Sequence, residues 1–167
     1  MIGLLLIVGV FMVPIAAVNR AYEAEARNWY KEYQYSTCFI DTAEWTGSGV
    51  FIDEDTILTA AHVLDGANDI EIELLDGTDI EVISVQYSDD IDCGIITVEP
   101  ADVNCVRIGT TDFLEVGDEI VIVGCPLGSD LNYTVTTGIV SGLDRDLQPL
   151  GEDLLQSDAQ SWPGNSG

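Results

Sequence analysis

Three side chains of this 167-residue sequence have the types and the order that acyl transfer requires. His62 follows an apolar run that ends where the chain turns, Asp92 precedes a second apolar run, and Ser166 lies in a Gly-Asn-Ser-Gly segment. A hydroxyl nucleophile needs a base to accept its proton, a carboxylate to hold that base in the correct tautomer, and backbone N–H groups to bind the oxyanion. The glycines around Ser166 permit a sharp turn that presents such N–H groups. The sequence therefore offers one candidate for each part.

Other interpretations of these residues stay open on the residues alone. A single histidine after a strand is commonly structural, and an isolated Gly-Asn-Ser-Gly can be a surface turn. Asp89 and Asp90 compete with Asp92 as the partner of the histidine, and we favour Asp92 because the apolar run 93–98 starts directly after it. Cys93 could be taken for a nucleophile, but the neighbouring acid raises the pKa of a thiol, so we interpret it as a core residue.

The elements that must position these residues are short β-strands. After Ser36 the sequence consists of short β-branched and apolar runs separated by Gly, Asp and Asn, with no long helical pattern among them. Residues 69–74 alternate apolar and acidic side chains, which is typical of a strand with one buried and one solvated face. Asp76 and Gly77 then supply a hairpin turn. Many short strands at this spacing predict an all-β barrel or sandwich.

An uncharged apolar run, residues 2–18, opens the chain and is long enough to span a bilayer or to direct export. No basic residue precedes it, and the best small-x-small match for a cleavage site, residues 24–26, lies beyond its end in a charged stretch, so we favour an uncleaved signal anchor over a removed signal peptide. No polar face interrupts the run, which argues against a buried core helix. Arg20, Arg27 and Lys31 follow it, and by the positive-inside rule they would hold that end in the cytoplasm, so the topology stays open. We expect a membrane-anchored or exported protein, with an extracytoplasmic location favoured.

The chain divides into parts by changes in its local pattern. Good helix formers without Pro or Gly follow the apolar run and predict a helical stalk. A strand pattern that ends at Pro100 indicates a join between two subdomains. The predicted parts are an anchor or signal at 1–19, a stalk at 20–36, and a β-rich domain at 37–167 whose subdomains are 37–100 and 101–167.

Composition excludes some partners. The sequence has 30 acidic and 5 basic residues, a formal charge of −25, so we expect no nucleic-acid partner. Such acidity is typical of a highly solvated surface or of a protein from a high-salt environment, and a site for basic ligands is the alternative. With one histidine and four cysteines in no CxxC pair, the sequence gives very little support for a zinc site. Disulfides and buried free thiols both remain open for the cysteines.

Several segments, taken in order, carry a resemblance to a known family. They are residues 47–52 (GSGVFI), 57–63 (ILTAAHV), 92–98 (DCGIITV), 123–128 (VGCPLG), 135–141 (VTTGIVS), 157–160 (SDAQ) and 163–167 (PGNSG). Together they resemble trypsin-like serine proteases, and specifically those of the HtrA/Deg branch. The resemblance runs from about Cys38 to Gly167. It implies an all-β fold of the chymotrypsin type with two β-barrels, preceded here by the hydrophobic N-terminal helix.

The same resemblance implies an activity and a set of roles. It implies a serine endopeptidase that hydrolyses peptide bonds of unfolded proteins through an acyl-enzyme, without a metal or cofactor. Carried over position by position, it makes Ser166 the nucleophile, His62 the general base and acid, and Asp92 the residue that orients His62. The backbone N–H groups of Gly164 and Ser166 would form the oxyanion hole. Polypeptide substrates are the implied partners, and a homotrimer is the implied assembly.

Departures from the family pattern modify these expectations. Val63 stands where extracellular trypsins carry a cysteine, so we expect no disulfide at the histidine loop, which favours the HtrA branch. In this family further strands follow the nucleophile and wall the substrate pocket. We therefore expect an incomplete second barrel and a fragment that is inactive alone. The alternative is a non-catalytic module that binds unfolded or basic polypeptides on a trypsin-like barrel.

Overall fold

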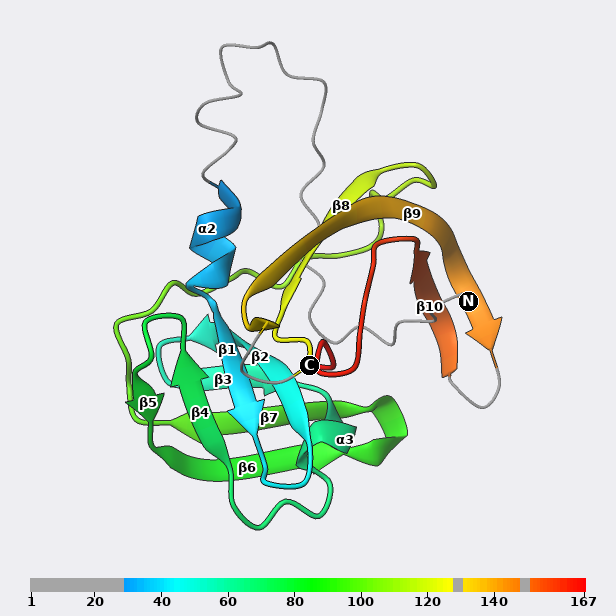
Figure 1. The fold of residues 1–167 in the computed structure, drawn as a ribbon. Coiled ribbons are helices and arrows are strands. Elements are labelled where there is room, and N and C mark those ends of the chain that lie inside the picture. Colours follow the sequence, from blue (N-terminus) through cyan, green and yellow to red (C-terminus); the bar gives the residue numbers. More distant parts are fainter. Residues whose placement is uncertain (1–28, 128–130, 148–150) are drawn as a thin grey trace.

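The protein folds into two antiparallel β-sheets, with the C-terminal end of the chain between them (Figure 1). The computed structural model describes residues 29–127, 131–147 and 151–167. Within these residues, one short helix, α2 (Trp29–Gln34), precedes the strands. The first sheet contains β1 (Thr37–Asp41), β2 (Thr46–Asp53), β3 (Thr56–Thr59), β4 (Glu71–Leu74), β5 (Asp79–Ile80), β6 (Val82–Ser88) and β7 (Cys93–Val98), and the second contains β8 (Glu119–Gly124), β9 (Thr134–Leu147) and β10 (Gly151–Ser157).

The strand order of the first sheet is β5-β4-β1-β2-β3-β7-β6. Its two outer strands, β5 and β6, follow one another almost directly in the chain, so the sheet curls and brings its two edges toward one another as a barrel. The predicted hairpin between β4 and β5 is confirmed, because the two strands pair antiparallel around Gly77, whose φ is +81°. The Thr78 N–H donates to Asp76 Oδ1 at 3.0 Å in this turn. Hydrogen bonds from Thr78 lower the pKa of Asp76.

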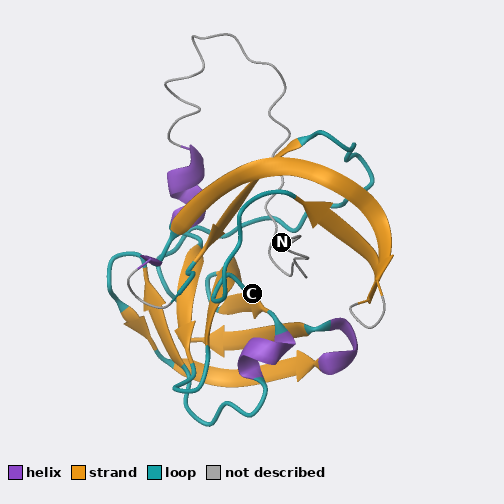
Figure 2. Cartoon of the chain, turned by 45° about the vertical axis from the view of Figure 1, so that its right-hand side comes forward, coloured by secondary structure: helices purple, strands orange, loops and turns teal. Residues whose placement is uncertain are grey.

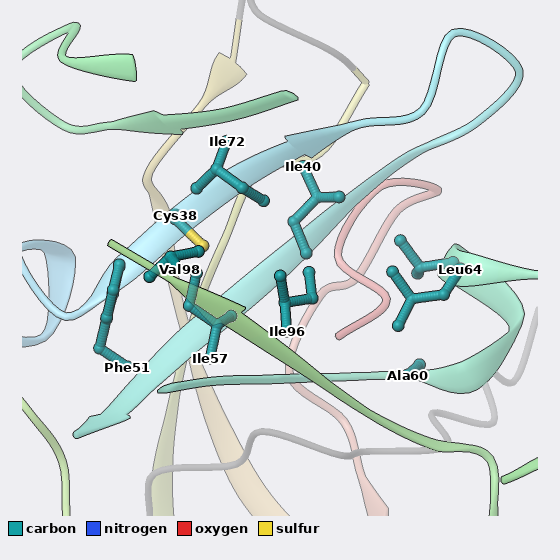
Figure 3. Close-up of a cluster of buried hydrophobic side chains, with 10 residues drawn as sticks. Cys38, Ile40, Phe51, Ile57, Ala60, Leu64, Ile72, Ile96 and Val98 are labelled. Carbon is teal, nitrogen blue, oxygen red and sulfur yellow. The ribbon is translucent and has the colours of Figure 1, made fainter. Parts of the chain in front are cut away.

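Apolar side chains from both walls fill the first barrel (Figure 3). The core residues, each at most 2% exposed, are Cys38, Ile40, Phe51, Ile57, Ala60, Val63, Leu64, Ile72, Ile96 and Val98. The alternation predicted for β4 is visible in this core, since Ile72 is buried and Glu71 is exposed. Burial of this many aliphatic side chains is the main force that holds the barrel together.

The second sheet, in the order β10-β9-β8, arches over the first as a half-barrel (Figure 2). Ile120, Val121 and Val140 of this sheet are buried. In the segment that leads to it, Ile108 is 72% exposed and Phe113 is 86% exposed. The prediction of an all-β fold with an incomplete second barrel is confirmed.

Tyr133 joins the two sheets and the helix that precedes them. Its hydroxyl donates to the carbonyl of Glu73 in β4 at 2.7 Å, and its own carbonyl accepts from Gln34 Nε2 of α2 at 2.6 Å. The ring is 7% exposed and packs with Phe39 and Cys125. These contacts fix the start of β9 against the first barrel.

The predicted anchor or signal at 1–19 lies outside the described residues. Of the predicted stalk at 20–36, the described part contains α2, whose last turn leads into β1. In the described ranges, no helix is long and apolar enough to cross a membrane.

All four cysteines lie in described parts of the chain, and all are free thiols. Cys38 and Cys125 are buried, Cys93 is partly buried and Cys105 is exposed. Burial raises the pKa of Cys125 to about 12. Burial also raises the pKa of Cys38 well above its usual value.

We predict that thiol alkylation of the native protein is selective. At pH 8 a thiol whose pKa is about 12 is ionised in a fraction of only about 10⁻⁴, and the thiolate is the reactive form. Iodoacetamide should therefore modify the exposed Cys105 well before Cys125 and Cys38, which should react only after unfolding. Peptide mass spectrometry over a time course measures the order. Equal rates for Cys105 and Cys125 in the native protein would contradict the described burial.

We also predict that Ile57→Ala lowers the free energy of unfolding by about 3 to 4 kcal/mol, because it opens a cavity in the closed core of the first barrel. Ile57 is fully buried. The matched control is Ile108→Ala, the same chemical change at a side chain that is 72% exposed, with an expected effect within about 0.5 kcal/mol. Urea denaturation measures both, and equal losses would refute the placement of Ile57 in the core.

Candidate active site

His62 lies on α3 (Ala61–Leu64), a single helical turn that follows directly after β3. Ala60 before it has an extended backbone, with φ −84° and ψ 145°, so the chain passes from strand to helix at this residue. Val63 and Leu64 are buried in the barrel core, whereas the imidazole is 54% exposed. Packing on the far side of the turn therefore holds the backbone of His62 while its side chain faces solvent.

Pairing of β7 with β3 places Asp92 beside His62. Thr59 at the end of β3 pairs with Gly94 of β7, which brings the start of β7 to the point where the histidine turn begins. A Cβ at position 94 would lie 2.5 Å from Leu64 Cδ1, so any larger residue there would require the Leu64 side chain to move. Asp92 itself has φ +44°, a left-handed conformation that aspartate adopts more readily than most residues.

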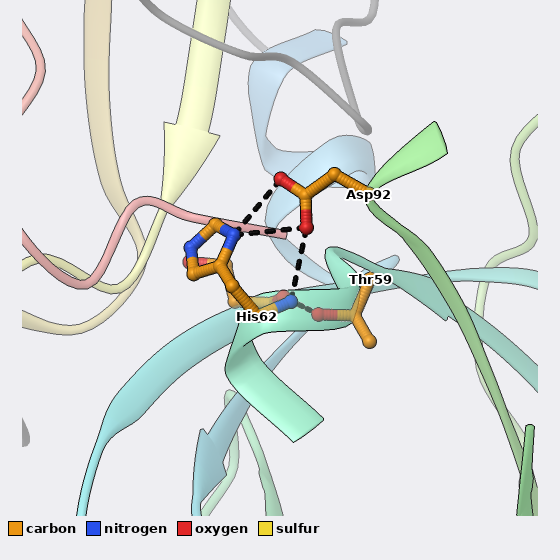
Figure 4. Close-up of polar contacts among 4 residues, drawn as sticks. Thr59, His62 and Asp92 are labelled. Atoms are coloured by element: carbon orange, nitrogen blue, oxygen red, sulfur yellow. Dashed lines mark hydrogen bonds and ion pairs between the residues drawn. The ribbon is translucent and has the colours of Figure 1, made fainter. Parts of the chain in front are cut away.

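The imidazole of His62 and the carboxylate of Asp92 are in direct contact (Figure 4). His62 Nδ1 lies 2.9 Å from Asp92 Oδ2 and 3.0 Å from Oδ1, and the backbone N–H of His62 also donates to Oδ1 at 2.9 Å. An ionised carboxylate only accepts hydrogen bonds, so it selects the tautomer with hydrogen on Nδ1 and leaves Nε2 as an acceptor. The carboxylate of Asp92 thus orients an imidazole whose Nε2 can accept a proton.

The competing residues of this segment lie in the turn before Asp92. Asp89 and Asp90 belong to the 3₁₀ turn η1 (Asp89–Ile91), and the side chain of Asp90 is exposed. Burial, and then the charge of Asp92, raise the pKa of Cys93, so this thiol is not activated as a nucleophile. Among the described residues, no group of three His, Cys, Asp or Glu side chains is placed to hold a metal ion.

Ser166 lies in a tight turn that packs against the end of β8. Gly164 in this turn has φ +97°, and a Cβ there would lie 2.6 Å from the carbonyl oxygen of Cys125. The Leu127 N–H donates to the carbonyl of Pro163 at 2.8 Å. Glycine at position 164 is thus required both by its φ and by the close approach of backbone.

The turn with Ser166 also reaches the first barrel. Gly47 of β2 stands between the two parts, since a Cβ there would lie 2.6 Å from Val63 Cγ1 and 3.1 Å from the carbonyl oxygen of Ser166. His62 and Asp92 are hydrogen-bonded to each other. Ser166 lies against β2, where its carbonyl accepts from the Ser48 N–H. In the part of the chain that the structure describes, no hydrogen bond joins the Ser166 hydroxyl to His62.

Two polar residues at this junction were not among the candidates from sequence. Ser48 is 4% exposed and bonds to the turn that contains Ser166, and Thr59 is fully buried and bonds to Ser48. The sequence carries one signal for Ser48: it is a serine between two glycines in a strand that is otherwise mostly apolar.

Comparison with known proteins places these observations in a family. A model of the trypsin-like peptidase domain matches residues 47–167. Serine protease Do-like HtrA of Bacillus subtilis is 36% identical over 138 residues, which are 76% of this chain and 31% of that protein. A protein of Halomonas elongata named "Probable periplasmic serine endoprotease DegP-like" is 34% identical over 123 residues, 72% of this chain and 26% of its own length.

A solved structure agrees with the sequence relatives. The HtrA-type protease AlgW with a tripeptide has a TM-score of 0.75 and 28% sequence identity, over 84% of this chain and 48% of that chain. This chain spans less than a third of the length of the two curated relatives. The predicted resemblance is confirmed, and the chain belongs to the trypsin-like peptidase family, with relatives of the HtrA/Deg type.

Proposed function

We propose that this protein is a serine endopeptidase in which His62, Asp92 and Ser166 form a catalytic triad. The observation that carries this proposal is the contact of His62 Nδ1 with both carboxylate oxygens of Asp92, at 2.9 and 3.0 Å. This contact leaves His62 Nε2 as the free proton acceptor, in an imidazole that is open to solvent and substrate. Membership of the family supports the reaction class.

The roles follow from this chemistry. His62 Nε2 takes the proton of Ser166 Oγ as the oxygen attacks the substrate carbonyl, and then gives it to the leaving amine. Asp92 keeps Nδ1 protonated and stabilises the imidazolium that forms. The N–H groups of Gly164 and Ser166 bind the oxyanion. Ser166 Oγ must come within hydrogen-bond reach of Nε2 for the first step, which in many proteases tightens only when substrate is bound.

We propose further that the substrates are unfolded polypeptides and that the protein is exported. The name of the Halomonas relative refers to the periplasm, and the AlgW structure holds a tripeptide. Residues 37–167 would form the peptidase domain. Anchoring by residues 1–19 and assembly as a homotrimer stay predictions.

We predict that the protein expressed from its uninterrupted reading frame cleaves unfolded, fluorescein-labelled casein. Ser166→Ala and His62→Ala should each lower kcat by roughly 10⁶, because removal of either member disables the whole triad. Asp92→Asn should lower it by roughly 10⁴, because the histidine would be held in the wrong tautomer. Fluorescence release measures all three.

Asp90→Asn is the matched control for the carboxylate, because it is the same change at an exposed position two residues away. It should leave kcat unchanged. Equal losses of kcat in Asp90→Asn and Asp92→Asn would refute the proposal that Asp92 orients His62. Equal cleavage by wild type and Ser166→Ala would refute the assignment of Ser166 as the nucleophile. Peptide binding that survives His62→Ala, without fluorophosphonate labelling of Ser166 in the wild type, would instead favour the non-catalytic binding module.

We expect the 167-residue chain by itself to have no measurable peptidase activity. The reason is the family resemblance, which implies further strands that wall the substrate pocket, and the match covers only 31% of the Bacillus subtilis relative. The measurement is casein cleavage by the purified chain at high concentration. Turnover that Ser166→Ala abolishes would refute this expectation.

A further inference from the structure

Ser48 of β2 is the centre of a group of hydrogen bonds between the two sheets. Its hydroxyl donates to the carbonyl of Gly164 at 2.8 Å and accepts from the N–H of Cys125 at 2.8 Å. Its backbone N–H donates to the carbonyl of Ser166 at 2.7 Å, and its carbonyl accepts from Thr59 Oγ1 at 2.8 Å. The side chain is 4% exposed, so these bonds do not compete with water.

The partners of Ser48 lie on three different segments that the site needs. Gly164 and Ser166 belong to the turn that bears the proposed nucleophile. Cys125 directly follows β8, the second-sheet strand on whose end that turn rests. Thr59 ends β3, directly before the turn of His62, and pairs with Gly94 of the strand that follows Asp92. One buried residue therefore touches both the part that carries the base and the part that carries the nucleophile.

The two carbonyls that Ser48 binds belong to the two residues proposed to supply the oxyanion-hole N–H groups. In a tight turn, fixing the carbonyl of a residue fixes its ψ, and so the direction of the next peptide unit. Gly164 has φ +97° and no side chain, so its own conformation is weakly restrained. Hydrogen bonds to its carbonyl are what can hold it in one orientation.

We propose that Ser48 is a positioning residue for the oxyanion hole, acting through the carbonyls of Gly164 and Ser166. This proposal rests on the proposed peptidase function. The hydroxyl holds the Gly164 carbonyl toward the first barrel, which fixes ψ of Gly164 and so the path of the chain between the N–H groups of Gly164 and Ser166. The hydrogen bond from Thr59 links Ser48 to the end of β3, so Ser48 also fixes the position of the Ser166 turn relative to His62.

The test compares the protein from its uninterrupted reading frame with Ser48→Ala and Ser48→Thr. The readouts are the rate of Ser166 labelling by a fluorophosphonate probe, and kcat and KM for a peptide substrate, all normalised to the folded fraction. Loss of one oxyanion donor lowers rates by roughly 10² to 10³, so loss of its support should lower labelling and kcat by about 10- to 100-fold, with KM little changed. Ser48→Thr retains a hydroxyl and should restore most of the rate.

Ser36→Ala is the matched control. Ser36 is 2% exposed, and its hydroxyl donates to the carbonyl of Glu32 at 3.0 Å, away from the site. Its labelling rate should equal that of the wild type. If Ser48→Ala does not fold, Ser48→Cys is tested in its place. Its thiol is a weak hydrogen-bond donor of similar shape, so it should show the same loss of labelling rate and kcat.

The outcomes separate this proposal from the function on which it rests. Labelling of the wild type, with Ser48→Ala as fast as Ser36→Ala, would overturn the role of Ser48 and leave the peptidase intact. Ser48→Thr as slow as Ser48→Ala would overturn it too, because the hydroxyl would then not be the reason for the loss. Absence of labelling in the wild type would overturn both proposals.

Discussion

The hydrogen bonds around Ser48 are the constraint on which the geometry of the candidate site depends. The first sheet carries His62 and Asp92, and the turn after the second sheet carries Ser166, so neither sheet contains the site alone. Three bonds of 2.7 to 2.8 Å join the buried Ser48 to the end of β8 and to the turn with Ser166, and a fourth, from Thr59, lies within the first sheet. Buried polar groups of this kind are costly unless every one is satisfied, and here each of these bonds satisfies a backbone group as well.

Close backbone approach is the second requirement, and glycine provides it on both sides of this junction. Gly47 separates the histidine helix from the carbonyl of Ser166, and Gly94 lets β7 pass the side chain of Leu64. Gly164 lies against the carbonyl of Cys125. A methyl group at Gly164 would collide with backbone, and one at Gly47 or Gly94 would displace the side chain of Val63 or Leu64 from the barrel core, so the packing of the barrel and the geometry of the site rest on the same residues.

Much of the fold was predictable because its determinants are local. Alternation in residues 69–74 and the turn residues Asp76 and Gly77 act within a few residues, and both β4 and its hairpin formed as expected. Tyr133 was not predictable, because its carbonyl binds Gln34 from a helix 99 residues away. Nor was the role of Ser48, since one of its partners, Gly164, lies 116 positions along the chain. Such contacts depend on which strands pair, and no local pattern records that.

The sequence by itself determined the strands, the family, and three candidates for the acyl-transfer roles in the order His62, Asp92, Ser166. It left Asp89 and Asp90 as alternatives to Asp92 for the partner of His62, because the sequence does not show which of several neighbouring carboxylates faces the imidazole. The tertiary structure placed Asp92 against the imidazole, since the β3–β7 register and the left-handed backbone of Asp92 turn its carboxylate to His62. It also decided that a serine in β2 joins the two sheets. Sequence encodes local conformation, whereas the distance between remote side chains is set by sheet register and packing.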